Sequence, residues 1–466
     1  MGKLLLVLRT LRYVKPIQIW NRIWRKFLPK GVSDYESPTE SLGEFEFLNV
    51  KGIPKGWNDS RFEKLWLYNL HYFDYLATMG DKECEEIIEK WIRDNPVGYG
   101  NGWDPYPISL RVVNWVKYFT RRGRSPRPTE RESLEAQVRW LRSRLEYHLL
   151  ANHLLANAKA LVFAGKFLGN EKWYNNGLAI YKKELPEQTC SDGVNFELSP
   201  MYHCIILEDV LDCFELTGDV LFKEYAEKML GGLKLVLGPD GKISKFNDST
   251  EGIALSPDQL LAYAKDLGVE SASEPVREAL TIRCSGYVRM EKGAYCVIAK
   301  CGDIGPSYQP GHAHADTFTF EMWKDGRKIV GDTGCSTYVP GPIRSYERST
   351  AAHNTVVIDG RNSSEVWAAH RVGRRFDKRT HQRKFVLEES GLRVVDSLGG
   401  SGVHDVEVRF HLPPGVSESD MEIDCSGERC VEPCDFATGW NKREAGTCVI
   451  YRNRLTLPAK IEWSLK

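Results

Sequence analysis

The feature that most constrains the fold is a change of sequence pattern near residue 275. Before it, in stretches such as RESLEAQVRWLRSRLEYHLLANHLLANAKAL and SPMYHCIILEDVLDCFELTG, apolar residues recur at i, i+3 and i+4, the spacing of amphipathic helices. After it, short β-branched runs such as GAYCVIAKCG and NTVVIDG are separated by Gly and Asp, which is typical of strands joined by turns. The chain is therefore predicted to be an α+β protein, with a helical array or toroid first and an antiparallel β-sandwich second.

The length of 466 residues also exceeds what one ordinary core supports. We expect an N-terminal extension at 1–55, a helical domain at 56–275 and an antiparallel sandwich at 276–466, with the joint in SASEPVREAL. Within the sandwich, KDGRK predicts a tight hairpin turn.

The charge balance excludes a general nucleic-acid binder. The 63 basic and 63 acidic residues give no net charge, whereas such a binder neutralises phosphates with an excess of Lys and Arg. An anionic substrate requires only a locally basic cleft. The 12 cysteines follow neither a zinc-ribbon nor a disulfide spacing, which favours free thiols in the cytoplasm.

The N-terminal stretch MGKLLLVLRTLRYVKPIQIWNRIWRKF predicts a basic amphipathic helix. Its apolar run is too short for a signal peptide or a membrane span, so a cytoplasmic location is expected. The helix either docks on the protein, which is the favoured interpretation, or makes peripheral contact with an anionic membrane surface.

Residues 311–320, GHAHADTFTF, place His312, His314 and Asp316 at alternate positions, which on a strand point to one face. A second pattern joins His314 to Asp332 and His353 on following strands. Two imidazoles and one carboxylate form a plausible zinc site with an open fourth position. The alternative is a set of hydrogen-bonded polar groups without metal.

The helical domain also carries polar side chains in apolar surroundings, where they need partners or a cavity. Those singled out for a substrate cleft are Asn69, His71, Trp103, Tyr106, Arg111, Asn152, His153, Asn157, Tyr202 and His203. Aromatic rings stack on sugars and Arg binds carboxylates, yet each of these residues also fits a packing role between helices.

In their order, NLHYFDY, WDPYPISLRVVNW, ANHLLANAKAL, SPMYH, GHAHADTFTFEMWKDGRKIVGDTGCSTY and STAAHNTVVIDG resemble the heparinase II/III family of polysaccharide lyases, which is related to alginate lyases. The resemblance implies an incomplete (α/α) toroid followed by an antiparallel β-sandwich. It also implies β-elimination at a uronic acid of an anionic polysaccharide.

The resemblance further assigns roles. Tyr202 would be the acid, and for one C5 configuration also the base, while His312 would be the base for the opposite configuration. Asn152, with His153 beside it, would neutralise the uronate carboxylate. His314, Asp332 and His353 would match a structural zinc site found in some members.

The chain departs from the family in having no evident secretion signal, which favours a role in the assembly of a bacterial exopolysaccharide or capsule. Two alternatives stay open. One is a glycoside hydrolase on an (α/α) toroid, for which Asp104, Glu197 and Asp209 supply carboxylates without a convincing pair. The other is an inactive glycan-binding scaffold in a polysaccharide assembly complex.

Overall fold

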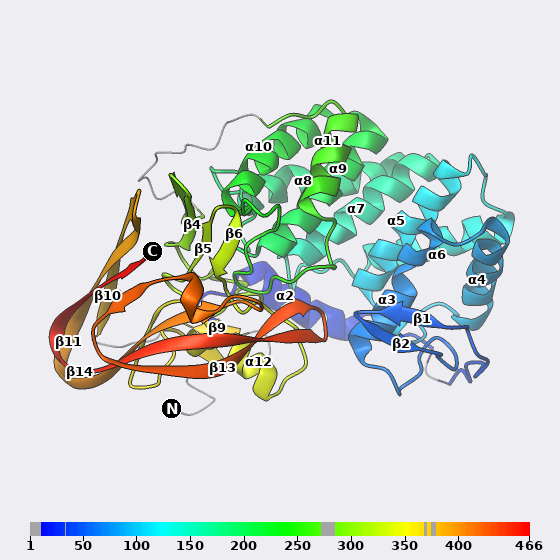
Figure 1. Ribbon diagram of the computed structural model, residues 1–466. Helices are drawn as coiled ribbons and strands as arrows, with labels where there is room; N and C mark the ends of the chain where they lie inside the picture. The colour runs from blue at the N-terminus through cyan, green and yellow to red at the C-terminus, as the bar shows by residue number, and fades with distance from the viewer. Residues whose placement is uncertain (1–10, 33, 272–284, 368–370, 374–378) are drawn as a thin grey trace. The chain divides into compact units, whose positions relative to one another are not determined.

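The computed structural model describes residues 11–32, 34–271, 285–367, 371–373 and 379–466 (Figure 1). The chain divides into two compact units. Unit 1 comprises Met1–Tyr13, Gln188–Glu208 and Lys223–Lys466, and unit 2 comprises Val14–Glu187 and Asp209–Phe222.

Helices dominate the first part of the chain, as predicted. They are α2 (Pro16–Trp24), α3 (Lys64–Tyr72), α4 (Asp81–Asp94), α5 (Pro105–Arg121), α6 (Pro128–Arg142), α7 (Ala151–Leu168), α8 (Glu171–Gln188), α9 (Pro200–Thr217), α10 (Val220–Val236) and α11 (Pro257–Asp266). Short 3₁₀ turns are η1 (Arg25–Phe27), η2 (Asp74–Ala77) and η3 (Asn101–Trp103), and β1 (Phe45–Phe47) pairs with β2 (Val50–Gly52).

Local signals explain where these helices begin and end. Pro105 opens α5 at its first position, where the missing N–H is not needed. Gly169 follows α7 with φ +69°, the left-handed conformation that ends a helix. In unit 2, α5 and α7 lie against each other, so the side chains on their facing sides are buried.

Unit 1 contains two antiparallel sheets. The four-stranded sheet has the order β3 (Tyr287–Lys292), β4 (Tyr295–Lys300), β5 (Phe320–Lys324) and β6 (Arg327–Val330). The six-stranded sheet has the order β10 (Thr380–Glu388), β11 (Gly391–Leu412), β14 (Lys442–Leu465) and β12 (Ile423–Cys425), with β13 (Glu428–Gly439) beside β14 and β7 (Val356–Ile358) beside β11. A separate hairpin joins β8 (Glu365–Trp367) to β9 (Arg371–Gly373).

The two sheets share one hydrophobic core, which makes them a sandwich. Phe320 and Met322 from the four-stranded sheet belong to the same buried cluster as Val394, Phe410 and Trp463 from the six-stranded sheet. Each of these side chains is at most 2% exposed. Burial of this apolar surface is the main force that holds the sheets together.

The predicted KDGRK hairpin is confirmed. Asp325 and Gly326 connect β5 to β6 with φ of 51° and 78°. Positive φ at both central residues is the mark of a type I′ turn, for which Asp-Gly is preferred.

Most of α10 and all of α11 belong to the compact unit that holds the sheets. The domain bounds given above remain a prediction. The predicted joint falls mostly on residues 272–284, outside the described chain. The 11 cysteines within the described ranges are all free. Over the same ranges, no helix is both long and apolar enough to span a bilayer.

Candidate active site

The segment GHAHADTFTF forms turns and loop, so the prediction of a strand here was wrong. Strand β5 begins only at Phe320, and Phe318 has φ of 65°, which an extended strand does not allow. The alternate spacing of His312, His314 and Asp316 therefore does not place these side chains on one strand face.

Asn247 holds this loop in place. Its side-chain oxygen accepts hydrogen bonds from the His314 N–H at 2.9 Å and from Lys300 Nζ at 2.7 Å. Its amide nitrogen donates to the Leu198 carbonyl at 2.7 Å. Lys300 also forms an ion pair with Asp316 at 2.7 Å, so Asp316 supports the loop and does not line the site.

The neighbouring Asp248 is the centre of the cluster. His312 Nδ1 donates to its Oδ2 at 3.0 Å, His314 Nε2 donates to its Oδ1 at 2.9 Å, and Arg344 Nη2 donates to Oδ2 at 2.9 Å. Burial by itself would raise the pKa of Asp248, but Arg344 and the two imidazoles hold that pKa well below its usual range. Asp248 is therefore an ionised carboxylate that fixes both imidazoles.

Tyr202, at the start of α9, packs against this cluster. Its ring stacks on His312 with ring centroids 3.8 Å apart and an interplanar angle of 27°. Its hydroxyl lies 3.1 Å from that of Tyr338. Burial and the nearby Tyr202 raise the pKa of Tyr338 well above its usual value, so Tyr338 keeps its proton and can donate a hydrogen bond to the Tyr202 oxygen.

The two ring nitrogens of His312 contact two different carboxylates, those of Asp248 and Glu197. Because Asp248 is ionised, Nδ1 carries the hydrogen, and in the neutral ring Nε2 holds the lone pair that can accept a proton. The Glu197 Oε2 atom lies 3.3 Å from Nε2, where its charge would stabilise the protonated ring. The side chain of His312 is 12% exposed and that of His314 0%, so of these two imidazoles only His312 can reach a substrate in solution.

The predicted zinc residues lie close together in unit 1. The rings of His314 and His353 are 5.3 Å apart, and His353 Nδ1 donates to Asp332 Oδ2 at 2.8 Å. The other nitrogens, His314 Nδ1 and His353 Nε2, are buried without a hydrogen-bond partner. A carboxylate at one nitrogen and an unpartnered second nitrogen is the arrangement of zinc-binding imidazoles, which bind the metal in their neutral form.

These residues suit zinc by the chemistry of their nitrogen atoms, but they are not arranged as a complete set of ligands. In the described part of the chain, no three His, Cys, Asp or Glu side chains are grouped as ligands of one metal ion. Asp332 is used as the hydrogen-bond partner of His353, which departs from the predicted set of three ligands.

A second polar cluster lies in unit 2. His153 Nδ1 is 3.1 Å from Glu146 Oε1, and the ring of Tyr106 is 4.6 Å from that of His153. Asn157 donates to Glu146 Oε2 at 3.0 Å, while Asn152 is 4% exposed at the start of α7. His153 and Tyr106 are partly exposed, so these two predicted binding residues can meet a ligand.

Arg111 is not available to a substrate, contrary to the prediction. It is fully buried and lies over the Trp91 ring at 3.8 Å. Its guanidinium donates to Gln137 Oε1 at 2.9 Å and to the carbonyls of His71 and Gly102. The side chain therefore joins α5, α6 and the end of α3, and its N–H groups donate to internal acceptors.

Four other predicted binding residues also have internal roles. Trp103 is 5% exposed, and His71 and His203 are fully buried. The Asn69 amide donates to the Leu65 carbonyl of its own helix at 2.8 Å. The alternative of a packing role is what the structure supports for these side chains.

The carboxylates considered for a hydrolase are also engaged. Asp209 forms an ion pair with the buried Lys159 at 2.6 Å, and Asp104 accepts a hydrogen bond from the Tyr68 hydroxyl. Glu197 Oε2 lies 3.3 Å from His312 Nε2. None of these contacts produces two opposed carboxylates with room for a sugar between them.

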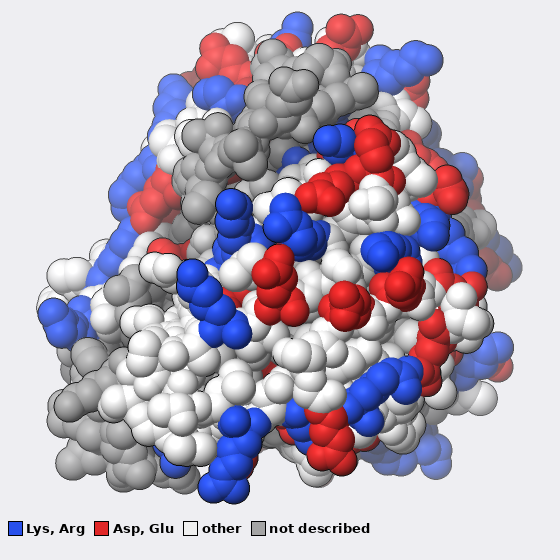
Figure 2. Space-filling view, turned by 60° about the vertical axis from the view of Figure 1, so that its left-hand side comes forward, with Lys and Arg blue, Asp and Glu red and all other residues white. Residues whose placement is uncertain are grey.

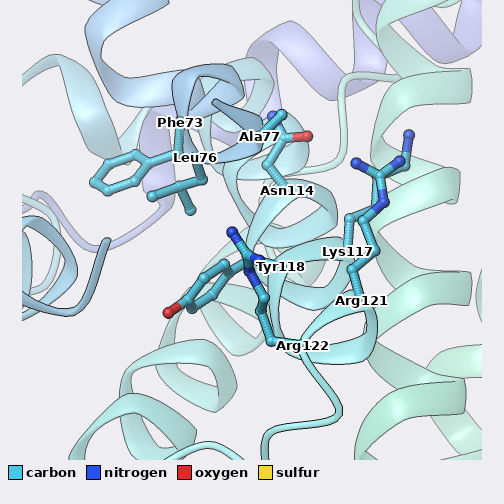
Figure 3. A pocket seen from close by; sticks show the side chains of 8 residues that line it. All are labelled: Phe73, Leu76, Ala77, Asn114, Lys117, Tyr118, Arg121 and Arg122. Carbon is cyan, nitrogen blue, oxygen red and sulfur yellow. The ribbon is translucent and has the colours of Figure 1, made fainter. Parts of the chain in front are cut away.

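Unit 2 also contains a pocket, whose lining does not include the cluster of Glu146, His153 and Asn157 (Figure 3). It has a volume of about 210 Å³ and is lined by Phe73, Leu76, Ala77, Asn114, Lys117, Tyr118, Arg121 and Arg122. Lys117 forms an ion pair with Asp212 at 2.6 Å. The pocket lies at the C-terminal end of α5, whereas Tyr106 lies at the opposite end of the same helix.

Sequence reasoning missed Asp248, Tyr338 and Arg344. Asp248 stands in KFNDST, which reads as a polar loop, and the other two stand in CSTYVPGPIRSYE. No regular spacing links these segments to GHAHADTFTF. Asn247 and Asp248 are both fully buried and therefore require partners, but this burial is a property of the tertiary structure that the sequence does not display.

Two family models match the chain. The model described as Heparinase II/III N-terminus matches residues 58–257, and the one described as Heparinase II/III-like, C-terminal matches residues 274–450.

Curated relatives carry the name heparin-sulfate lyase. The protein from Pedobacter heparinus is 24% identical over 398 residues, which cover 73% of this chain and 59% of the relative. The protein from Bacteroides stercoris is 22% identical, with 81% of this chain and 65% of the relative covered. The chain thus spans less than two thirds of the length of these two relatives.

Among solved structures, a heparan sulfate lyase mutant from Pedobacter heparinus matches with a TM-score of 0.63 at 18% identity, covering 96% of this chain and 86% of that one. This likeness confirms the predicted fold class, a helical toroid with C-terminal antiparallel sheets.

Proposed function

Because this chain belongs to the heparinase II/III family, we propose that it is a polysaccharide lyase that cleaves a uronic-acid-containing glycan by β-elimination. The observation that carries the proposal is the stacked pair of Tyr202 and His312, with Asp248, Glu197 and Tyr338 around it. The names of the curated relatives make a glycosaminoglycan the first substrate class to test.

His312 would remove the C5 proton of the uronate. Its Nε2 holds the lone pair, and the ring is fixed by the hydrogen bond from Nδ1 to Asp248. When Nε2 takes the proton, the new positive charge lies between the carboxylates of Asp248 and Glu197, which stabilise it.

Tyr202 would protonate the O4 leaving group. A phenol is a weak acid, so its conjugate base needs stabilisation when it gives up the proton. The hydroxyl of Tyr338 supplies this by donating a hydrogen bond to the Tyr202 oxygen. For substrates of the opposite C5 configuration, Tyr202 would also serve as the base.

The C5 proton becomes acidic only if the uronate carboxylate is neutralised. Asn152, with His153 beside it, is proposed for this role from the resemblance. Replacement of Asn152 by Ala tests it: turnover should fall by about 10²- to 10³-fold, as for the loss of an oxyanion-hole donor. Unchanged turnover would remove Asn152 from the proposal.

The reaction class is tested with heparosan, heparan sulfate, hyaluronan, chondroitin and alginate, by recording the ultraviolet absorbance of the unsaturated uronate product. We expect absorbance with at least one glycosaminoglycan. New reducing ends without that absorbance would indicate hydrolysis instead, and glycan binding without any cleavage would indicate a scaffold.

The roles within the pair are tested with Tyr202→Phe and Tyr338→Phe. Loss of the Tyr202 hydroxyl should abolish turnover but leave glycan affinity largely intact, whereas loss of the Tyr338 hydroxyl should lower turnover by roughly 10-fold, one lost hydrogen bond. An active Tyr202→Phe enzyme would refute the assignment of the acid.

We propose zinc as a structural metal, held through His314 Nδ1 and His353 Nε2 with Asp332 beside them. When bound, zinc would brace the loop that carries His312 and would take no part in the elimination. Elemental analysis of protein purified without chelator tests this, and a metal-free protein of full thermal stability would remove the site.

A role in exopolysaccharide or capsule assembly, in the cytoplasm, is the narrower part of the proposal. Cell fractionation with an antibody to the chain tests the location.

A further inference from the structure

The amphipathic helix α2 is inverted relative to an ordinary surface helix. Gln18 is fully buried, whereas Trp20, Trp24 and Phe27 are 64%, 50% and 76% exposed. A helix on a soluble protein normally turns its apolar side inward. Here the polar side faces unit 2 and the apolar side faces outward.

Polar contacts fix this orientation within unit 2. Gln18 Nε2 donates to the Leu149 carbonyl at 3.4 Å, Arg22 Nη2 to the His148 carbonyl at 3.2 Å, and Arg25 Nη1 to the Arg144 carbonyl at 2.9 Å. An ion pair joins Lys15 to Glu187. Residues 15, 18, 22 and 25 follow one helical stripe, so the helix is attached by its polar side.

The opposite side is a continuous apolar surface. It is made of side chains that are between 38% and 76% exposed, namely Ile17, Ile19, Trp20, Ile23, Trp24 and Phe27. We call this surface the α2 face. Trp is the side chain most characteristic of the membrane–water interface, because its ring is apolar and its N–H is polar.

The segment that carries the α2 face has charged side chains of one sign. Residues 11–32, which include α2, contain six Lys and Arg and no Asp or Glu, in a chain whose total charge is zero. In contrast, basic and acidic side chains are mixed on the face of the molecule in Figure 2. A positive segment beside exposed Trp and Ile is complementary to anionic headgroups above acyl chains.

From this geometry we infer that the α2 face is a docking surface for an anionic lipid bilayer, onto which the protein binds peripherally. The charged side chains bring the helix to the surface, and the apolar side chains enter the boundary between headgroups and acyl chains. The polar contacts with unit 2 hold the enzyme body against the helix, so docking does not require the helix to detach.

Flotation of the full-length protein with vesicles tests the inference. Vesicles of phosphatidylcholine mixed with phosphatidylglycerol should carry the protein upward, and vesicles of phosphatidylcholine alone should carry far less. Trp20→Ser with Trp24→Ser should lower the partition coefficient at least about tenfold. Lys26→Gln with Lys30→Gln should lower the partition coefficient roughly fivefold for each charge removed. Added salt should also lower it, because salt screens the attraction to the anionic headgroups.

Matched controls separate the α2 face from general surface effects. Val403→Ser with Val431→Ser removes exposed apolar side chains in unit 1, and Lys172→Gln with Lys182→Gln removes exposed charges in unit 2. Both should partition like the unchanged protein, and all variants should keep its thermal unfolding midpoint.

Two outcomes would overturn the inference. One is a protein that stays in solution with both kinds of vesicle. The other is a Trp20/Trp24 double variant that binds anionic vesicles like the unchanged protein. If light scattering instead showed a dimer that this double variant abolishes, without vesicle binding, a second copy of the chain would be the occupant of the α2 face.

Discussion

His312 in unit 1 and His153 in unit 2 have similar surroundings, but the carboxylates that they contact are compensated by different positive charges. Each is partly exposed and has Nδ1 on a buried carboxylate, Asp248 at 3.0 Å and Glu146 at 3.1 Å. Beneath Asp248 lies Arg344, a permanent cation. Within the described chain, the groups that lower the pKa of Glu146 are neutral or titratable: His153 contributes most, and Asn157 donates a hydrogen bond.

The difference lies in what compensates the charge of each carboxylate. Burial would raise the pKa of both carboxylates, and in each the surroundings lower it. For Asp248 the compensation comes first from Arg344, so the carboxylate stays ionised whether or not His312 is charged. For Glu146 it comes first from His153, so the two groups behave as one pair. A cycling base is better placed in unit 1.

The largest expected effect separates these two histidines by activity. His312→Asn should lower kcat/KM by roughly 10³- to 10⁴-fold on substrates of the C5 configuration that it serves, because general base catalysis is lost. His153→Asn should cost only about 10-fold, as a neighbour that positions substrate. Initial rates with defined oligosaccharides measure both, and equal losses would contradict the comparison.

A smaller effect separates the two carboxylates by stability. Arg344→Met leaves Asp248 without its permanent cation and should cost about 3 kcal/mol, the low end for a broken buried pair, because the imidazoles can take up charge. Asn157→Leu removes a neutral donor from Glu146 and should cost about 2 kcal/mol. Urea unfolding at neutral pH measures both, and a larger loss for Asn157→Leu would reverse the comparison.

The smallest effect concerns His203, a buried histidine whose two ring nitrogens are both hydrogen-bonded to the backbone. Its Nδ1 accepts from the Asn195 N–H, and its Nε2 donates to the Met229 carbonyl. Burial lowers the pKa of His203 to about 4. In the unfolded chain the imidazole has its usual pKa near 6.5, so between these values the unfolded state binds more protons.

Acidification should therefore destabilise the protein through His203. The loss begins as the pH falls below about 6.5 and is complete near the folded pKa, amounting to about 2 kcal/mol between about pH 7 and about pH 5. The difference in urea midpoint between those pH values should be smaller in His203→Gln. An unchanged pH dependence in this variant would show that other groups set it.

The periodicities predicted the elements well, because helices and strands place apolar residues at spacings that the chain itself carries. The helical first part, the sandwich and the KDGRK turn all follow from such local patterns. The strand predicted for GHAHADTFTF was wrong because it also relied on a local pattern. The residues alternate as in a strand, but the positive φ at Phe318 belongs to a loop that is held by contacts with distant segments.

The site was predicted only in part. Tyr202 and His312 were singled out from sequence and resemblance, and the structure brings them into ring contact. Arg111 and His203 looked equally suited to a ligand, yet burial makes them internal partners. Exposure depends on residues far away in the chain, so no local pattern reveals it.

By itself, then, the sequence determined the class of each half, the residue types available for proton transfer, and the basic apolar start of the chain. Tertiary structure alone decided that Asp248 gathers His312, His314 and Arg344, and that α2 turns its apolar side outward. The reason is physical: periodicity is a property of neighbours along the chain, whereas charge compensation and burial depend on which distant segments meet.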